Sequence, residues 1–391
     1  MLAKTPRMLG LDSRLKPLLQ IDATIEMLRM QPANKSSSKQ RVSMSSDTLD
    51  LSPAEYASLL TNLAKDDPYG TDSYGCGGVV DALEACMAKT LGKPAAVIMP
   101  TGTMSNLLAV QFLAGKARKA IVQTESHLYN DCGDCAQSLA GINLIPLGAD
   151  ATFDVDSISH AIERIDDGKV AAPIGVISIE SPVRRLDGEM FDFDTMHAVC
   201  QFARERNIRL HLDGARLFVA SVYSGHKLTD FTSMFDTVYV SLYKNFNTLS
   251  GAILAGPTEI IDQLRHWRRR NGGGLAQWWP VATVALHYHD GLSDRLKTAA
   301  ADAKEFYDSL KNNDNFNVQE VPNGSSVRYV SCPGKDFSFL NELRTKLKQH
   351  RIDLPKPGSK RLHFALKTNE SWLRSDPQTL ADAFVDAVSS D

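Results

Sequence analysis

The sequence has no long apolar run, few cysteines and no excess of charge of either sign. No stretch approaches the roughly 20 apolar residues that a membrane-spanning helix needs, so we expect no membrane partner. Six cysteines in 391 residues are too sparse for a disulfide scaffold, which favours a reducing, cytoplasmic location. The 43 basic and 46 acidic residues give a formal net charge of -3, which argues against a nucleic-acid partner held by phosphate contacts.

Three parts of unequal weight are predicted along the chain. Residues 1–50 form an amino-terminal arm and linker, in which Leu15–Met30 has apolar residues at helical spacing and Asn34–Lys39 is polar. Residues 51–290 alternate amphipathic stretches with short apolar runs, which indicates mainly parallel strands with helices on both faces. Residues 291–391 mix helix and strand patterns, which indicates a smaller α+β carboxy-terminal domain. The predicted fold class is therefore α/β.

Short apolar runs predict the seven strands of the large sheet. They are Ala95–Met99, Lys119–Gln123, Asn143–Leu147, Gly175–Ile179, Ile208–Leu212, Thr237–Leu242 and Ala252–Ala255. In open α/β sheets, ligands bind beyond the carboxyl ends of the strands, so the polar residues that follow these runs are the candidate site. They are Thr101 to Thr103, Ser126 and His127, Glu180 and Ser181, Asp213 to Arg216, and Ser241 to Lys244.

Each of these residues has an ordinary explanation when taken singly. Gly102 suits a plain turn, His127 a core histidine, Asp213 a helix cap and Lys244 a solvated lysine. Together, however, they indicate a site for an aldehyde cofactor. A partly desolvated Lys244 becomes a nucleophile toward a carbonyl, because burial lowers the pKa of its amine. A carboxylate at Asp213 can keep a pyridine nitrogen protonated and so turn the ring into an electron sink.

The turn before the predicted helix at Met104 suits an anion. The free backbone N–H groups and the helix dipole at Gly102 and Thr103 favour a phosphate. The ring of His127 could stack on a flat cofactor, and Arg216 could form a bidentate pair with a substrate carboxylate.

The sequence resembles the threonine aldolase / β-eliminating lyase family of fold-type I pyridoxal-phosphate enzymes. The resemblance covers roughly residues 46–286 in matching order and continues more thinly to the carboxy terminus. The motifs that carry it are Ser46-Asp47-Thr48, Asp66-Asp67-Pro68-Tyr69-Gly70, Pro100-Thr101-Gly102-Thr103-Met104-Ser105-Asn106, His211-Leu212-Asp213-Gly214-Ala215-Arg216-Leu217-Phe218 and Gly272-Gly273-Gly274. The resemblance implies a lyase that cleaves a β-hydroxy amino acid into glycine and an aldehyde, on a mainly parallel seven-stranded sheet.

The resemblance also implies how pyridoxal 5'-phosphate would be held. Lys244 would form the covalent bond to the cofactor aldehyde, and Asp213 would pair with its pyridine nitrogen. His127 would stack over the ring, while Gly102 and Thr103 would hold the phosphate.

Binding of the substrate and of a second subunit follows from the same resemblance. Ser46, Arg216 and Arg361 would grip the carboxylate of a small amino acid. Arg269 would reach the phosphate of a neighbouring subunit. The family shares its sites across a dimer interface, so we expect a homodimer or a homotetramer.

Three departures from the family pattern bear on the substrate, one of which is the bulky Tyr243 and Phe246 beside Lys244, where small residues are more usual. The family's aldolases commonly carry a histidine three residues after the strand-end glutamate, and here that position is Val183, which cannot accept a proton. The arginine that follows the glycine triplet in the family is Ala276 here. These changes leave open a β-elimination on a β-substituted amino acid, or a non-catalytic protein of the same fold.

One further motif has the spacing of a redox or metal site. Cys132-Gly133-Asp134-Cys135 is a Cys-x-x-Cys sequence, but no second pair accompanies it. A zinc site usually needs four ligands, so we predict no metal.

Overall fold

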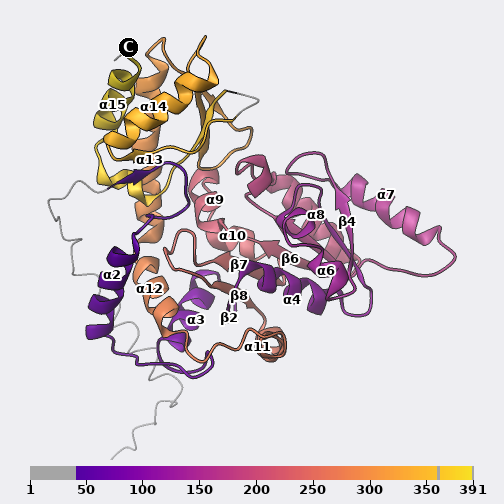
Figure 1. Cartoon of the computed structure of the whole chain (residues 1–391). Coiled ribbons are helices and arrows are strands. Elements are labelled where there is room, and N and C mark those ends of the chain that lie inside the picture. Colours follow the sequence, from indigo (N-terminus) through magenta and orange to yellow (C-terminus); the bar gives the residue numbers. More distant parts are fainter. Residues whose placement is uncertain (1–40, 359–361, 390–391) are drawn as a thin grey trace, which may run out of the picture. The chain divides into compact units, whose positions relative to one another are not determined.

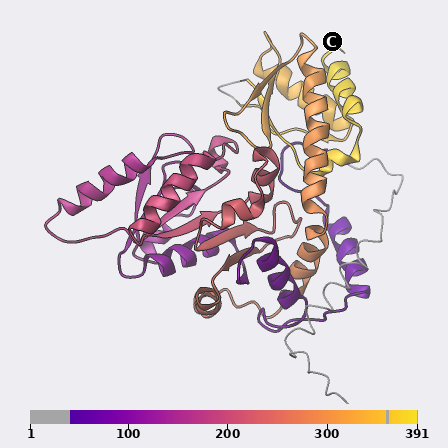
Figure 2. The ribbon, with the colours of Figure 1, turned by 180° about the vertical axis from the view of Figure 1, so that it is seen from behind.

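The computed structural model describes residues 41–358 and 362–389. The predicted helix over Leu15–Met30, the linker Asn34–Lys39 and Arg361 therefore lie outside the described residues. Figure 1 labels the main elements, and Figure 2 shows the same ribbon from behind.

Helices make up much of the described chain. They are α2 (Pro53–Lys65), α3 (Gly78–Thr90), α4 (Gly102–Ala114), α5 (His127–Asn130), α6 (Cys135–Ser138), α7 (Val155–Asp166), α8 (Phe193–Glu205), α9 (Leu217–Ser224), α10 (Leu228–Thr232), α11 (Thr258–Arg270), α12 (Trp279–His289), α13 (Leu292–Lys311), α14 (Phe337–Gln349) and α15 (Pro377–Ser389), with the 3-10 turns η1 (Arg184–Leu186) and η2 (Glu370–Arg374). Several begin at a polar cap. Ser52 and Glu55 form a capping box at the start of α2, and Asp192 accepts the backbone N–H of Thr195 at the start of α8.

The large sheet contains seven strands in the order β2-β8-β7-β6-β5-β3-β4. Their bounds are β2 (Ala95–Met99), β3 (Lys119–Gln123), β4 (Asn143–Leu147), β5 (Val176–Glu180), β6 (Arg209–Asp213), β7 (Thr237–Ser241) and β8 (Ala252–Gly256). Strands β4, β3, β5, β6 and β7 pair in parallel, and β8 runs antiparallel to both β7 and β2. The prediction of a mainly parallel, seven-stranded α/β sheet is confirmed.

The strands present alternate side chains to two helical layers. Val97 and Met99 of β2 pack in one core with residues of α4 and α11. Ala96 and Ile98 pack in the other core with residues of α3, α8, α9 and α12. Both faces of the sheet are therefore covered, which is why its strands read as continuous apolar runs in the sequence.

The carboxy-terminal part is α+β, as predicted. Strands β9 (Asn317–Glu320), β10 (Val327–Ser331) and β12 (Phe364–Lys367) form an antiparallel sheet in the order β12-β10-β9. Its core also takes in residues of α13, α14 and α15. Extended structure in β12 begins only at Phe364, because Leu362 has a φ of 48°.

A short amino-terminal strand joins this carboxy-terminal core. Strand β1 (Val42–Ser43) pairs in parallel with β11 (Ile352–Asp353), and the side chains of Val42 and Met44 are buried among carboxy-terminal residues. This arrangement brings the segment that follows, Ser45 to Thr48, to the candidate site.

Candidate active site

The carboxyl ends of the parallel strands meet at a cavity of about 430 Å³. It is lined by Ser45, Ser46, Asp47, Thr48, His127, Glu180, Arg184, Asp213, Ala215, Arg216, Tyr239, Tyr243, Lys244 and Lys367. Five of these residues were predicted from four separate segments of the sequence: Ser46, His127, Asp213 with Arg216, and Lys244. The fold thus brings together residues nearly 200 positions apart, as expected for the strand ends of an open α/β sheet.

Lys244 follows the buried strand β7 by three residues. Its Nζ lies 2.8 Å from the Oγ of Ser241 and 3.5 Å from the hydroxyl oxygen of Tyr243. Burial, together with the positive charge of Arg216, lowers the pKa of the Lys244 amine below its ordinary value. A lysine in this setting is more often neutral, and hence nucleophilic, than a solvated one.

Asp213 ends β6 and is held by two donors. The side-chain amide of Asn106, on α4, donates to Oδ2, and the backbone N–H of Ala215 donates to Oδ1 at 3.2 Å. Behind Asn106 lies the fully buried ring of His211, whose Nδ1 is 2.8 Å from the Oγ1 of Thr237. Burial lowers the pKa of His211 to about 4, so this ring is neutral at pH 7.

The amino terminus of α4 has the features of a phosphate cradle. The side chain of Thr101 caps the helix by accepting the backbone N–H of Met104 at 3.1 Å. Within the described chain, the backbone N–H groups of Gly102 and Thr103 have no acceptor, as expected for the first turn of a helix. A Cβ at Gly102 would overlap the hydroxyl of Tyr239, so only glycine fits here. These free amides, the amine of Lys244 and the carboxylate of Asp213 together fit a phosphorylated pyridine aldehyde.

His127 begins α5 directly after the turn that follows β3. Its Nδ1 lies 3.2 Å from the Sγ of Cys132, and its backbone N–H donates to Oε2 of Glu180. The hydrogen bond with Cys132 raises the pKa of the His127 imidazole. The carboxylate of Glu180 also accepts the backbone N–H of Arg184 at 2.9 Å. Burial and the nearby charge of Asp213 raise the pKa of Glu180 to about 7.

Arg216 is held by a second carboxylate. Its Nε and Nη2 donate to the two oxygens of Asp47 at 3.0 and 2.8 Å, and the Nζ of Lys367 lies 3.6 Å from the same carboxylate. Burial acts to raise the pKa of Asp47, but the charges of Arg216 and Lys367 hold it well below its ordinary value. Arg216 thus faces the cavity with its guanidinium already oriented by an ion pair.

The remaining predicted residues lie elsewhere. Arg269 is exposed in the last turn of α11, with its guanidinium 4.7 Å from the ring centroid of Tyr74, and it does not line the cavity. Arg361 lies outside the described residues. Val183, at the position where the family's aldolases have a histidine, is fully buried and does not line the cavity either.

Sequence reasoning gave no role to Asn106, Asp47 or Glu180, although Asn106 and Asp47 lie in the quoted motifs and Glu180 follows a predicted strand. Asn106 follows Thr103 by three residues on a helix, so a signal was present, because such residues share one face of the helix. Glu180 was noted at a strand end, but its burial beside Asp213 depends on the pairing of β5 with β6.

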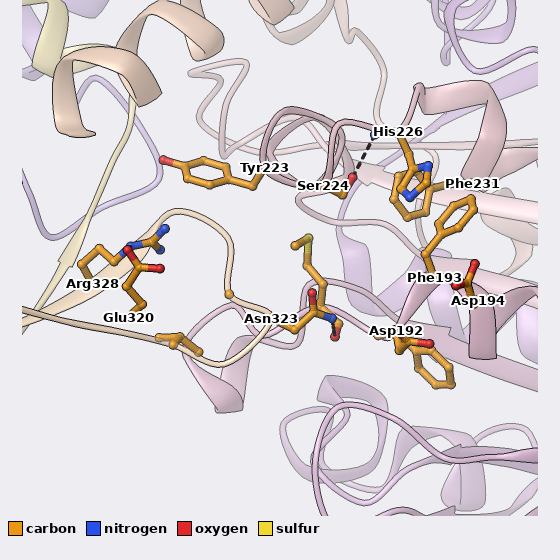
Figure 3. Close-up of a pocket in the computed structure, with 14 residues that line it drawn as sticks. Asp192, Phe193, Asp194, Tyr223, Ser224, His226, Phe231, Glu320, Asn323 and Arg328 are labelled. Carbon is orange, nitrogen blue, oxygen red and sulfur yellow. Dashed lines mark hydrogen bonds and ion pairs between the residues drawn. The ribbon is translucent and has the colours of Figure 1, made fainter. Parts of the chain in front are cut away.

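A larger cavity of about 530 Å³ lies away from these groups (Figure 3). It is formed near the start of α8, the end of α9 and the loop between β9 and β10. In it the rings of Phe193 and His226 stack with centroids 3.6 Å apart. No lysine lines this cavity, so it offers no side-chain amine that could bind an aldehyde as a Schiff base. Among the described residues there is also no group of three or more His, Cys, Asp or Glu that could hold a metal ion.

The sequence model of the beta-eliminating lyase family matches residues 54–331, which is more than half of the chain. The chain belongs to the beta-eliminating lyase family. A low specificity L-threonine aldolase of Escherichia coli is 31% identical over 251 residues, which are 60% of this chain and 74% of that enzyme. An uncharacterized protein of Caenorhabditis elegans is 31% identical over 276 residues. The match covers 70% of this chain and 64% of the Caenorhabditis elegans protein.

A solved structure agrees with this assignment. A protein from Exiguobacterium, assigned as an aromatic amino acid beta-eliminating lyase/threonine aldolase, superposes with a TM-score of 0.74 at 25% identity. The match covers 90% of this chain and 98% of that one. The family and its structural neighbours are fold-type I pyridoxal-phosphate enzymes. The chain is therefore a pyridoxal-phosphate-dependent lyase resembling the threonine aldolases.

Proposed function

We propose that this lyase cleaves a small β-hydroxy amino acid between Cα and Cβ, releasing glycine and an aldehyde. The observation that carries the proposal is the single cavity that contains Lys244, Asp213, His127 and Arg216. Two of these groups suit a cofactor that carries an aldehyde on a pyridine ring, and Arg216 suits a substrate that carries a carboxylate.

We assign the cofactor contacts as follows. Lys244 would bind the aldehyde, Asp213 would pair with the pyridine nitrogen and His127 would lie against the ring, while Gly102 and Thr103 would hold the phosphate. When bound, the cofactor supplies an electron sink for the pair released at Cα. Asn106 keeps the Asp213 carboxylate in place, and burial keeps Lys244 ready to lose or accept a proton.

The substrate carboxylate would be held by Arg216 and Ser46, with Arg361 as a further proposed contact. Arg216 is already oriented by Asp47, so substrate binding needs little ordering of its side chain. Aldol cleavage requires that the β-hydroxyl lose its proton. In the described cavity, we propose His127, whose pKa is raised above its ordinary value, or Glu180, whose pKa is raised to about 7, as this base, and a positioned base is worth on the order of 10²–10⁴ in rate.

A β-elimination is the alternative, and the buried Val183 favours it. A histidine at this position would serve as the base for the β-hydroxyl of an aldolase substrate. β-Elimination does not remove a proton from a hydroxyl, so the valine does not hinder it. In that reaction Lys244 would remove the proton from Cα and a substituent on Cβ would leave.

Two measurements test these assignments. Cofactor-saturated protein should show an absorbance band that borohydride abolishes, and reduction should attach the cofactor to the peptide that contains Lys244. Lys244→Ala should lose the band, whereas Lys367→Ala, a matched lysine of the same cavity, should keep it. If the wild type shows no band, the enzyme assignment is wrong.

Incubation with L-threonine, L-allo-threonine and phenylserine then separates the two reactions. Aldehyde and glycine in equal amounts support aldol cleavage. Ammonia and a keto acid without aldehyde would replace it with β-elimination.

We also propose a homodimer or homotetramer, a cytoplasmic location and the three-part division at residues 50 and 290. The exposed position of Arg269 leaves it available to a neighbouring subunit. All six cysteines are unpaired, which suits a reducing compartment. No helix in the described ranges is long and apolar enough to cross a membrane.

A further inference from the structure

The Cys-x-x-Cys motif lies beside the candidate active site. Cys132 follows α5, and Cys135 begins α6. Gly133 and Asp134, between them, have φ of 57° and 52°, the sign pattern of a type I′ turn. The backbone N–H of Cys135 donates to the carbonyl of Cys132 at 3.2 Å, which closes the turn.

This turn holds the two thiols within bonding reach of each other. The Cα atoms at the ends of such a turn are less than about 7 Å apart, and disulfides span Cα separations of about 4.4–6.8 Å. The interaction between the two thiols lowers the pKa of Cys135 and raises that of Cys132. No large backbone movement is needed to join them.

The same cysteine contacts two groups of the site. The Sγ of Cys132 lies 3.2 Å from Nδ1 of His127 and 3.8 Å from the hydroxyl of Thr103. No other side chain in the described chain makes a hydrogen bond to the ring of His127. The position of this imidazole therefore depends on the thiol of Cys132.

We propose that Cys132 and Cys135 form a reversible disulfide that switches the lyase off by releasing His127. The proposal rests on the role given to His127 under the proposed function. The proposal goes beyond that function by naming a modification site, the pair Cys132 and Cys135. It also names the class of reagent that modifies it, hydrogen peroxide or another small hydroperoxide.

The reaction balances without a metal. The two thiols give up two protons and two electrons, and one S–S bond forms. The O–O bond of the hydroperoxide breaks. The hydroperoxide takes up the two protons and two electrons and is released as water and an alcohol, or as two waters if it is hydrogen peroxide. A small oxidant fits best, because Cys135 is buried and Cys132 is half-buried. An external thiol reverses the reaction by reducing the disulfide.

Oxidation changes the site in a defined way. The Sγ of Cys132 turns toward Cys135 to form the S–S bond, so its contact with Nδ1 of His127 is lost. Because that bond is the main cause of the raised pKa of His127, oxidation should lower this pKa and free the ring to rotate. Thr103, in the phosphate cradle, loses a neighbour at the same time.

The experiment uses the full-length, cofactor-saturated protein treated with hydrogen peroxide. Peptide mapping without reductant should find Cys132 joined to Cys135 in a peptide that is lighter by two hydrogen atoms. Most of the lyase activity should be lost, and dithiothreitol should restore it. Cys135→Ser should keep its activity in peroxide, because Cys132 and His127 remain paired. Cys76→Ser removes an exposed thiol and should stay as sensitive as the wild type.

The outcomes separate this proposal from the proposed function. If no 132–135 disulfide forms in the wild type, or if Cys135→Ser is inactivated in step with it, the switch is wrong. If Cys135→Ser fails to fold, Cys135→Ala and peptide mapping of the oxidised wild type still test whether the 132–135 disulfide causes the inactivation. If the disulfide forms in a protein that has no lyase activity, the proposed function is refuted and the switch with it, whereas an active protein that forms no disulfide refutes the switch alone.

Discussion

The Nε2 atom of His211 lies 3.0 Å from the Oδ1 atom of Asn106. Because the amide nitrogen of Asn106 donates to Asp213, its oxygen must accept, and the hydrogen of His211 must therefore be on Nε2. The Nδ1 atom is then left to accept from the hydroxyl of Thr237. The amide of Asn106 and the Nε2–H of His211 behind Asp213 thus have fixed donor and acceptor roles, and the neutral ring that burial favours satisfies them.

The burial of His211 within this hydrogen-bond network predicts how the free energy of unfolding depends on pH. Burial depresses the pKa of His211 from 6.5 to about 4 in the folded protein. The folded state thus binds fewer protons than the unfolded state between these values. The contribution of His211 is complete above about pH 6.5 and is lost as pH falls through 6.5 toward 4. The loss amounts to about 3 kcal/mol in the free energy of unfolding.

Urea unfolding at several pH values between 7.5 and 4 tests this. His211→Gln should flatten the decline, whereas His197→Gln, at an exposed histidine of α8, should leave it unchanged. Equal slopes in His211→Gln and the wild type would contradict the assignment.

The same hydrogen bonds predict cofactor affinity. Asn106→Leu removes the side-chain donor to Asp213, and a hydrogen bond to a charged group is worth about 1.5–3 kcal/mol. We expect pyridoxal phosphate to bind at least about tenfold more weakly, as measured by absorbance titration of the apoprotein. Asn271→Leu is the control, because its amide bonds only Trp267 at the exposed end of α11. Unchanged affinity in Asn106→Leu would show that Asp213 needs no such support.

Much of this site could be predicted from sequence, because the residues proposed to hold the cofactor directly follow strands that read as continuous apolar runs. The position of Lys244 after β7 and of Asp213 at the end of β6 needed no knowledge of the three-dimensional contacts. The pairing of Arg216 with Asp47 could not be predicted, because the two residues are 169 positions apart. Their contact depends on the pairing of β1 with β11, which are two-residue strands too short to leave a periodic pattern.

The ion pair between Asp47 and Arg216 predicts a stability defect that ligands repair. Asp47→Asn leaves a buried guanidinium without its charge partner, which costs about 3–5 kcal/mol. A carboxylate ligand can take the place of Asp47, so glycine or acetate should raise the Tm of the variant more than that of the wild type. Asp308→Asn removes exposed ion pairs with Lys304 and Lys311 and should leave the free energy of unfolding nearly unchanged. Equal ligand shifts in variant and wild type would mean that Arg216 does not bind carboxylates.

The charges around Lys244 predict two opposite shifts in the pH dependence of cofactor binding. The amine must be neutral to attack the cofactor aldehyde, so the rate of covalent binding to apoprotein should rise with pH and level off below the ordinary lysine pKa of 10.5. After burial, the positive charge of Arg216 does most to lower this pKa, whereas Tyr243 acts to raise it. Arg216→Gln should therefore move the rate profile to higher pH and Tyr243→Phe to lower pH. Stopped-flow absorbance at a series of pH values measures both shifts. If both variants move the profile in the same direction, the pKa of the Lys244 amine is set by how deeply the amine is buried, and not by the charges of Arg216 and Tyr243.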